Sequence, residues 1–519
     1  MVASYTVKYM SHKIINPAVV IFLVFAAGVI FSCAMTQPVA RDEQMYCSGA
    51  ILMSQGQTPY KDFSYVAQLP YYPLLLSAIY KITGTTHYLL TARIVSCIAD
   101  FLTVLFTILI FRKIFYQFPF SGLFFGLAAA TLLLFNPLIH YITGLAWNHN
   151  IVICLVVISF YLYLPSGWQT GPGYWRTAAL AALLTFAACM RITTILILFI
   201  FFIAVIFRKF PSAKEKKFNI LIFVFTSVLV FAWPLWIIAQ SPRAFFLNLI
   251  SIPELNGLLL IQMGLFYPKF RFAYNILTSL EFLFPILIVC YLYVLMFNRP
   301  QDKKSSIPVS IIFLALSLPA AFLIIAFIPI TIWLQYLAIP IPFLLISLAI
   351  PLLSLREMAD SAHLKIASFL LAACVVVTIL QQTTILKPIA ALSSPQSWQP
   401  MRLHNLSVEI AEKIDKSAPV LTIAPLYALE GSCRIYPQLS SGLFTYRIAD
   451  NLTDDQRRIT KTVGPASLKQ LLQSSPPSAV IAGTEQGSGF DNLESTLLTA
   501  VSPGWSSQTF GNGILVYTK

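Results

Sequence analysis

The sequence has little charge. Only 10% of its 519 residues are Asp, Glu, Lys or Arg, whereas 58% are hydrophobic. Soluble globular proteins contain about 25% charged residues, so this chain lacks the polar side chains that would cover a water-exposed surface. The composition therefore excludes an ordinary soluble protein and predicts a polytopic α-helical membrane protein.

Several sequence signatures of chemistry are also missing. The chain has no CxxC pair, no zinc-ligand spacing, no nucleotide-phosphate loop and no nucleophilic Ser/His/Asp pattern. Its eight cysteines are scattered, and whether Cys47 and Cys433, both predicted outside the cytoplasm, form a disulfide stays open. The net charge of +14 comes from Lys and Arg in short loops between apolar runs. The positive-inside rule explains this excess, so no nucleic-acid partner is predicted.

Long apolar runs predict about eleven membrane-spanning helices, since a span needs about 20 apolar residues. The predicted spans cover residues 14–35, 89–111, 120–142, 151–164, the two halves of 177–207, 219–239, 274–296, 307–328, 333–353 and 366–385. Lys8 and Lys13 precede the first span, which places the N-terminus in the cytoplasm. The first run is too long for a signal peptide and has no small-residue cleavage site.

Arg191 interrupts the apolar run of residues 177–207. A single helix of this length would exceed a hydrocarbon core of about 30 Å and would bury the guanidinium near its centre. The sequence therefore predicts two short helices that meet at Arg191 on the outer side. This split also places the basic cluster of residues 208–217 in the cytoplasm, as the charge rule requires.

Three polar regions are predicted outside the cytoplasm. The transmembrane domain, residues 1–386, carries a first loop at residues 37–87 and a second at 241–271. The first loop contains an amphipathic helix over residues 42–54, suited to the membrane interface, and a short apolar helix over 70–82. Residues 387–519 form a small α/β domain, with strands predicted at 418–424, 477–483 and 513–517 and helices at 403–416 and 466–473.

An acidic pair, Asp42-Glu43, begins the first helix of the first loop. Acidic residues favour the first turn of a helix and Asp42 could be its N-cap, so a purely structural role is one interpretation. The pair also lies at the membrane surface, near Arg41 and Lys61, which could orient carboxylates or phosphates. The alternative interpretation is that the loop forms part of an active site.

A series of motifs accompanies this pair. The segment GQTPYKD at residues 56–62 and the segment PYYPL at 70–74 follow it, Arg191 lies between two short helices, and Gln335-Tyr336 precedes Pro340 and Pro342. Together these features resemble the GT-C superfamily of glycosyltransferases, most closely its bacterial protein-mannosyltransferase and aminoarabinose-transferase-like branch. The resemblance covers nearly all of the membrane part, and the acidic pair is its most specific element.

The resemblance implies transfer of a sugar from a polyprenyl phosphate to a lipid, glycan or protein, at the outer face of a bacterial inner membrane. It assigns Asp42 as the general base and Glu43 as a supporting group. A carboxylate that takes the proton of a hydroxyl makes it a better nucleophile, and inversion by single displacement needs one base. The leaving phosphate needs positive charge, for which Arg191, Lys269 and Arg271 are candidates. Ordinary interfacial anchoring is the alternative for these three cations.

Further substrate-binding candidates are Arg41, Tyr60, Lys61, Asp62, His149, Gln335 and Tyr336, although residues 60 and 62 could simply form a turn. Many members of the superfamily carry a second acidic residue between the third and fourth spans. Here that turn reads Trp147-Asn148-His149-Asn150, where His149 could substitute by hydrogen bonding or the turn could be only structural. No cofactor is predicted, and a divalent metal, which prefers carboxylates, stays undecided. The rival functions are a transporter or flippase of lipid-linked sugars, which would show paired broken helices, and an anchor for the C-terminal domain.

Overall fold

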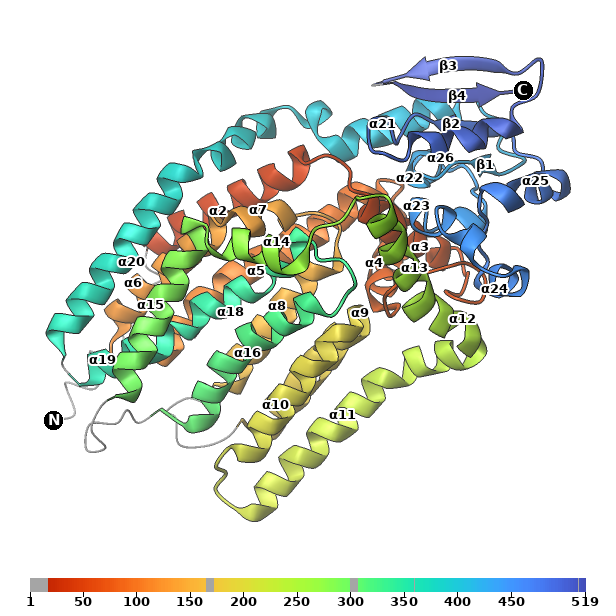
Figure 1. The fold of residues 1–519 in the computed structure, drawn as a ribbon. Helices are drawn as coiled ribbons and strands as arrows, with labels where there is room; N and C mark the ends of the chain where they lie inside the picture. Colours follow the sequence, from red (N-terminus) through yellow and green to blue (C-terminus); the bar gives the residue numbers. More distant parts are fainter. Residues whose placement is uncertain (1–16, 165–171, 299–306, 359, 512) are drawn as a thin grey trace.

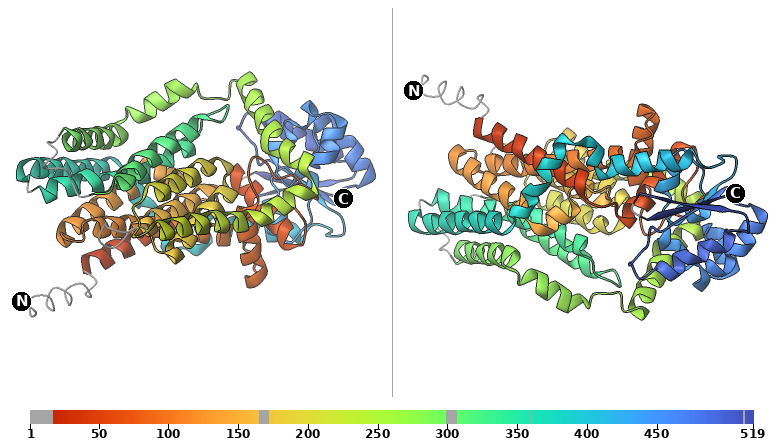
Figure 2. Two further views of the ribbon diagram at one scale, coloured as in Figure 1. Left: turned by 90° about the horizontal axis from the view of Figure 1, so that it is seen from below. Right: turned by 90° about the horizontal axis from the view of Figure 1, so that it is seen from above.

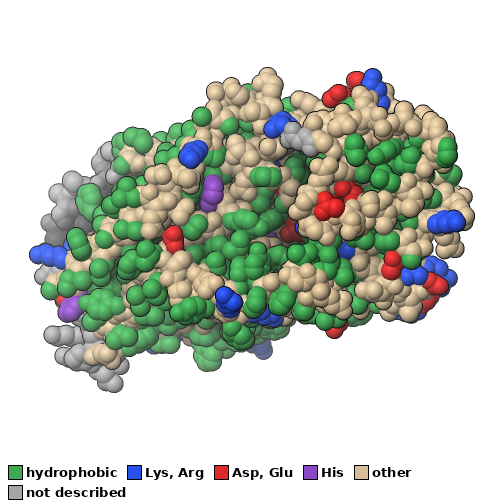
Figure 3. Space-filling view, turned by 45° about the horizontal axis from the view of Figure 1, so that its top comes forward, with side chains coloured by type: hydrophobic (Ala, Val, Ile, Leu, Met, Phe, Trp, Pro, Cys, Tyr) green, Lys and Arg blue, Asp and Glu red, His purple; other side chains and the backbone are tan. Residues whose placement is uncertain are grey.

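The computed structural model describes the chain except residues 1–16, 165–171, 299–306, 359 and 512. Lys8 and Lys13, on which the predicted orientation rests, lie outside the described residues. The helices form an elongated bundle, and a small domain with a β-sheet lies at one end of it (Figures 1 and 2). On the face that Figure 3 shows, hydrophobic side chains are spread over the bundle, with only a few charged side chains among them.

By length and composition, eight helical stretches within the described residues can cross a membrane. They are α2 (Pro17–Thr36), α5 (Tyr88–Ile114), α11 (Ala213–Gln240), the run Pro242–Gln262, α15 (Leu280–Phe297), α16 (Val309–Phe327), the run Leu334–Glu357 and α20 (Ser361–Gln381). Four shorter apolar helices are α6 (Pro119–Leu134), α8 (Asn148–Tyr163), α9 (Tyr174–Met190) and the run Ile192–Phe207, which contains η1 (Ile192–Thr194) and α10 (Ile195–Phe207). The predicted polytopic α-helical fold is confirmed.

Two breaks shape these helices. Residues 120–142 were predicted as one span, but α6 ends at Leu134 and α7 (Pro137–Ile142) starts afresh. Pro137 cannot donate a backbone hydrogen bond, and the Asn136 side chain accepts from the amides of Leu138 and Ile139 at 3.0 and 3.2 Å, so a new helix begins there. The second break is the predicted one: Arg191, with φ −142° and ψ 103°, separates α9 from η1 and α10.

The first loop contains the two predicted helices, α3 (Arg41–Ser54) and α4 (Tyr71–Thr83). Helix α3 lacks the exposed face of an amphipathic surface helix, because every residue from Glu43 to Leu52 is buried. Its predicted position in the membrane interface stays a prediction. Helix α4 covers one side, where the rings of Tyr46 and Tyr72 meet edge to face with centroids 5.1 Å apart. Helices α5 and α22 (Leu426–Leu429) also contact α3.

Residues 241–271, predicted as a loop, are largely helical. They form α12 (Pro242–Phe246), the π-helical turn η2 (Leu247–Ser251), α13 (Ile252–Gln262) and the start of α14 (Lys269–Leu277). The Asn248 carbonyl accepts from the Ala67 amide at 3.0 Å, and the Asn256 side-chain amide donates to the Phe444 carbonyl at 2.8 Å. This segment therefore packs against both the first loop and the C-terminal domain.

The C-terminal domain is a small α/β domain, as predicted. Its sheet has the order β1-β2-β4-β3, with β1 (Val420–Leu421) parallel to β2 (Ala479–Ala482), and β4 (Ile514–Thr518) antiparallel to β2 and to β3 (Ser506–Phe510). Strand β3 has no predicted counterpart because four of its five residues are exposed and polar. Between the bundle and this domain, η4 (Thr383–Ser393) packs against α2. The helices of the domain are η5 (Pro395–Ser397), α21 (Gln399–Ala411), α22, η6 (Pro437–Leu439), α23 (Leu443–Tyr446), η7 (Ala449–Asn451), α24 (Asp454–Thr460), α25 (Pro465–Ser474), α26 (Asp491–Ser495) and η8 (Thr496–Ala500). The short helices α17 (Leu334–Ala338), α18 (Pro340–Ser347) and α19 (Ala349–Glu357) make up the run Leu334–Glu357.

Candidate active site

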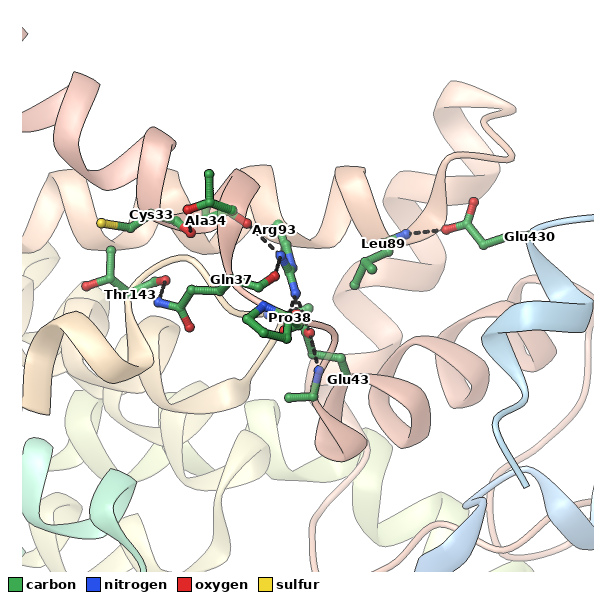
Figure 4. Close-up of polar contacts among 12 residues, drawn as sticks. Cys33, Ala34, Gln37, Pro38, Glu43, Leu89, Arg93, Thr143 and Glu430 are labelled. Carbon is green, nitrogen blue, oxygen red and sulfur yellow. Dashed lines mark hydrogen bonds and ion pairs between the residues drawn. The ribbon is translucent and has the colours of Figure 1, made fainter. Parts of the chain in front are cut away.

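The first turn of α3 is anchored by a buried ion pair between Glu43 and Arg93 of α5 (Figure 4). The two carboxylate oxygens accept from Nε and Nη2 of Arg93 at 2.8 and 2.7 Å, and both side chains are fully buried. Glu43 also accepts from the amides of Ala40 and Ala146, at 2.9 and 2.8 Å. With four donors on its oxygens, Glu43 acts as an orienting group that fixes the start of α3 and the turn before α8.

Arg93 completes this anchor with its remaining N–H groups. Its Nη1 donates to the carbonyls of Ala34 and Gln37 at 2.6 and 2.8 Å, and its Nη2 donates to Pro38 at 3.0 Å. The end of α2 and the start of α3 are therefore tied to one guanidinium. Arg93 was not among the residues predicted from the sequence, although a charged residue within an apolar span is itself a signal of a buried polar partner.

Asp42, between Arg41 and Glu43, is half-buried, and no side-chain hydrogen bond holds it among the described residues. Burial raises the pKa of its carboxyl to about 6, and the neighbouring Glu43 carboxylate adds to the rise. Three cations oppose this rise, namely Arg447, Arg41 and Arg191 in order of decreasing influence. Asp42 is therefore a largely ionised carboxylate at neutral pH, in cationic surroundings and with an affinity for protons well above that of an ordinary aspartate.

Arg191 lies in a set of buried polar atoms that have no hydrogen-bond partner among the described residues. Its side chain is 4% exposed; Nε donates to Thr193 at 3.2 Å, whereas Nη1 has no partner. The other unpartnered atoms nearby in the fold are the indole N–H of Trp147, Oδ1 of Asn148, both ring nitrogens of His149, the Thr194 hydroxyl and Oε1 of Gln335. Buried polar atoms normally find partners, so this concentration makes the region a candidate ligand site.

Aromatic rings connect these elements. The guanidinium of Arg191 lies 4.9 Å from the ring centroid of Tyr336, and the ring of His149 stacks on the same tyrosine with centroids 6.1 Å apart. Trp147 meets His149 edge to face at 5.9 Å. The guanidinium of Arg191 is also one of the cations that lower the pKa of the Asp42 carboxyl. The predicted residues Asp42, His149, Arg191, Gln335 and Tyr336 are therefore brought together, from α3, α8, the break after α9, and α17.

The C-terminal domain contributes a further cation, Arg447, which was not predicted from the sequence. Its Nε donates to Oδ1 of Asn256 at 2.5 Å, and its guanidinium lies between the rings of Phe444 and Phe490, 5.3 and 5.1 Å from their centroids. Burial lowers the pKa of Arg447 to about 10, so it stays charged at neutral pH. It is more than 400 residues from Asp42 in sequence, and no local motif indicates the pairing.

Arg41 lies at the junction with the same domain. Its Nε donates to both oxygens of the buried Glu485, at 3.0 and 3.1 Å, and its guanidinium lies 5.2 Å from the ring of Phe490. A cavity of about 70 Å³ adjoins this pair, lined by Ala40, Arg41 and residues of the C-terminal domain. The predicted substrate-binding residue Arg41 is therefore engaged in holding the C-terminal domain on α3.

Five other candidates lie outside this cluster. Tyr60 is buried and donates to the Gln68 carbonyl at 2.6 Å, and Asp62 accepts from the Thr58 amide at 2.7 Å, so both shape the turn of the first loop. Lys61 is exposed and lines a different depression. Lys269 donates to the Phe327 carbonyl at 2.9 Å, and Arg271 is exposed. The structure records no contact of these five residues with Asp42 or Arg191.

Asp100 of α5 is a half-buried carboxylate that was not among the residues predicted from the sequence. Its Oδ2 accepts from the Gly144 amide at 2.7 Å and from the Asn150 side chain at 2.9 Å. Asp100 therefore fixes the turn that carries Trp147 and His149. Among the described residues, no group of three or more His, Cys, Asp or Glu side chains is placed to hold a metal ion. Glu43 is saturated by donors and Asp42 is surrounded by arginines, a donor set that does not suit a divalent cation.

The fold and this site define a polytopic membrane protein with a polar cluster covered by an α/β domain. No protein-family model and no curated protein matches the sequence. Among solved structures, ArnT from Cupriavidus metallidurans bound to undecaprenyl phosphate matches with a TM-score of 0.58 and 14% identity, over 96% of this chain and 97% of that chain. Its apo state matches with a TM-score of 0.55 at the same identity and coverage. The chain therefore has the GT-C fold that the sequence resemblance predicted.

Proposed function

We propose that this protein is a membrane glycosyltransferase that moves a sugar from a polyprenyl phosphate to a hydroxyl-bearing lipid, glycan or protein. The observation that carries the proposal is the clustering of the half-buried Asp42 with the buried Arg191 and with unpartnered polar atoms of His149 and Gln335. The likeness to ArnT, a protein solved with undecaprenyl phosphate, supports a lipid-phosphate donor. In this proposal the site faces the outside of a bacterial inner membrane, with the N-terminus in the cytoplasm.

Asp42 acts as the general base in this reaction. The oxygen of the acceptor hydroxyl forms a bond to the anomeric carbon of the sugar, and the hydroxyl proton passes to the Asp42 carboxylate. At the same time, the bond between the anomeric carbon and the oxygen of the lipid phosphate breaks. One displacement of this kind inverts the anomeric configuration. A pKa of about 6 suits the role, because the carboxylate is mostly ionised at pH 7 yet is a stronger base than an ordinary aspartate.

Arg191 stabilises the departing lipid phosphate. The phosphate leaves with the electron pair of the broken bond, and a buried guanidinium with an available N–H offsets that charge more strongly than it would in water. His149, Gln335 and Tyr336 line the sugar-binding side of the cluster, and Glu43 orients the base. This reaction assigns no role to Lys269 or Arg271.

The proposal is tested in two stages. Mass spectrometry of envelope glycans, lipids and glycoproteins in a deletion strain identifies the sugar and acceptor by what is lost. Transfer by complemented membranes is then compared for wild type, Asp42→Asn and Asp415→Asn. Asp415 is a fully exposed aspartate of the C-terminal domain, so its variant controls for loss of a carboxylate. Asp42→Asn should abolish transfer at normal protein level; transfer at the wild-type rate would remove Asp42 as the base.

A further inference from the structure

A basic depression lies away from the Asp42 cluster, where the first loop, α12 and α24 meet. It is open and measures about 580 Å³. Four cationic side chains line it: Lys61 of the first loop, Arg243 of α12, and Arg458 and Lys461 from the end of α24. These segments are far apart in sequence, so the gathering of charge is produced by the docking of the C-terminal domain on the bundle.

The positive charge of this depression is only partly balanced. A single carboxylate, Asp455, bridges the two arginines, at 3.1 Å from Arg243 and 2.7 Å from Arg458. Neither Lys61 nor Lys461 forms an ion pair with any carboxylate of the described residues. Like charges held together repel each other, and a bound anion would relieve that repulsion while it accepts hydrogen bonds from two kinds of donor.

The depression lies at the end of a lipid-facing helix. Helix α11 exposes large apolar side chains along its length, among them Phe225, Val228, Leu235 and Trp236. It ends at Gln240, and the next two residues, Ser241 and Pro242, already line the depression. An exposed tryptophan one turn before the end of a span is typical of the membrane–water boundary. The basic side chains therefore lie at the level of lipid headgroups.

We propose that this depression binds the phosphate headgroup of an anionic membrane lipid. The ligand differs from the donor assigned to Arg191, because the depression shares no lining residue with the Asp42 cluster and its ligand needs no reaction at Asp42. The phosphodiester of such a lipid carries one negative charge and has acceptor oxygens for both lysines. The acyl chains of the lipid would then lie along the apolar surface of α11. The continuity with that surface favours a lipid over a free anion.

The test measures lipid binding by native mass spectrometry of the full-length protein released from micelles doped with phosphatidylglycerol or phosphatidylcholine. Wild type should retain phosphatidylglycerol in preference. The double variant Lys61→Gln/Lys461→Gln should lower its affinity by about tenfold or more, since each basic residue near an anionic surface contributes several-fold. It leaves the Asp455 bridge intact. The control Lys413→Gln/Lys469→Gln removes two exposed lysines elsewhere in the C-terminal domain and should bind like wild type.

Three outcomes would overturn the proposal. They are equal retention of phosphatidylcholine, unchanged affinity of the Lys61/Lys461 double variant, and full displacement of the lipid by an equal concentration of inorganic phosphate. The last would mean that the depression takes free phosphate rather than a headgroup. Thermal unfolding of each variant checks that it is folded, and weaker phosphatidylglycerol binding by wild type at 0.5 M salt gives a second measure that needs no substitution.

Discussion

Asn at position 42 should stabilise the folded protein at neutral pH, although it removes the proposed base. Burial lifts the pKa of the Asp42 carboxyl to about 6 from its ordinary 3.8, and Glu43 adds to the rise. The charged carboxylate is therefore less stable in the folded protein than in the unfolded chain. One pH unit of pKa corresponds to about 1.4 kcal/mol, so the charge destabilises the fold by at most about 3 kcal/mol, and by less because water partly screens the side chain.

The pH dependence of this effect has a definite sign. Between about pH 4 and pH 6 the folded protein keeps the Asp42 proton while the unfolded chain loses it, so stability falls as pH rises through this range. Asn is neutral at every pH and matches protonated Asp in size. The stability gained by Asp42→Asn should therefore be near zero at pH 4 and reach about 1–3 kcal/mol above pH 7.

The assay is the thermal unfolding midpoint of the detergent-purified protein, followed at one heating rate because membrane proteins often unfold irreversibly. Wild type, Asp42→Asn and the exposed control Asp415→Asn are compared from pH 4 to pH 8. The midpoint of Asp42→Asn should rise above that of wild type as the pH increases. Asp415→Asn should not rise above wild type, because hydrogen bonds from Ser417 lower the pKa of the Asp415 carboxyl and favour its charged form. If the unfolding midpoint of Asp42→Asn lies below that of wild type at pH 8, or if the difference between the two does not depend on pH, Asp42 is not a partly buried carboxyl with a raised pKa.

Three further predictions concern its neighbours. Arg93→Met should lower the free energy of unfolding by about 3–5 kcal/mol, because it leaves Glu43 buried and uncompensated; adding Glu43→Gln should recover part of the loss in the same unfolding assay. Arg191→Ala should reduce kcat by about 10²–10³-fold, and Arg191→Lys should restore only part of it, since a lysine lacks the planar guanidinium; wild-type kcat in both would exclude contact with the leaving phosphate. Arg447→Met removes the strongest cationic influence on Asp42, so the pKa of that carboxyl should rise and the acidic limb of the pH–rate profile should move to higher pH; an unmoved limb would contradict this.

Local sequence patterns predicted the fold correctly where a single residue determines the backbone conformation. Arg191 interrupts an apolar run, and the helix breaks there because a guanidinium within a continuous span would be costly. The helices of the first loop and three of the four strands followed from hydrophobic pattern and turn residues. In contrast, Asn136-Pro137 broke a span that hydrophobicity alone joined, and residues 241–271 formed helices under contacts from the first loop and the C-terminal domain.

Side-chain partners were not predictable from the sequence. In the sequence, Glu43 looks equivalent to its neighbour Asp42. In the structure, Arg93 and two backbone amides donate hydrogen bonds to the Glu43 carboxylate, so the two carboxylates have different chemistry. Lys61 is near Asp42 in sequence but faces a separate depression, whereas Arg447 is distant in sequence and acts on Asp42. Which side chains contact each other depends on tertiary packing. No local motif in a single sequence indicates these contacts.

The first turn of α3 has a consequence for the order of events during biosynthesis. Three consecutive residues point to three parts of the molecule: Arg41 to Glu485 of the C-terminal domain, Asp42 to the polar cluster, and Glu43 to Arg93 of the bundle. The bundle partner is synthesised early, but Glu485 and Arg447 leave the ribosome only after every membrane helix has been made. The charge environment of Asp42 is therefore completed last, and a chain whose C-terminal domain has not yet docked holds its carboxylate without the cations that tune it.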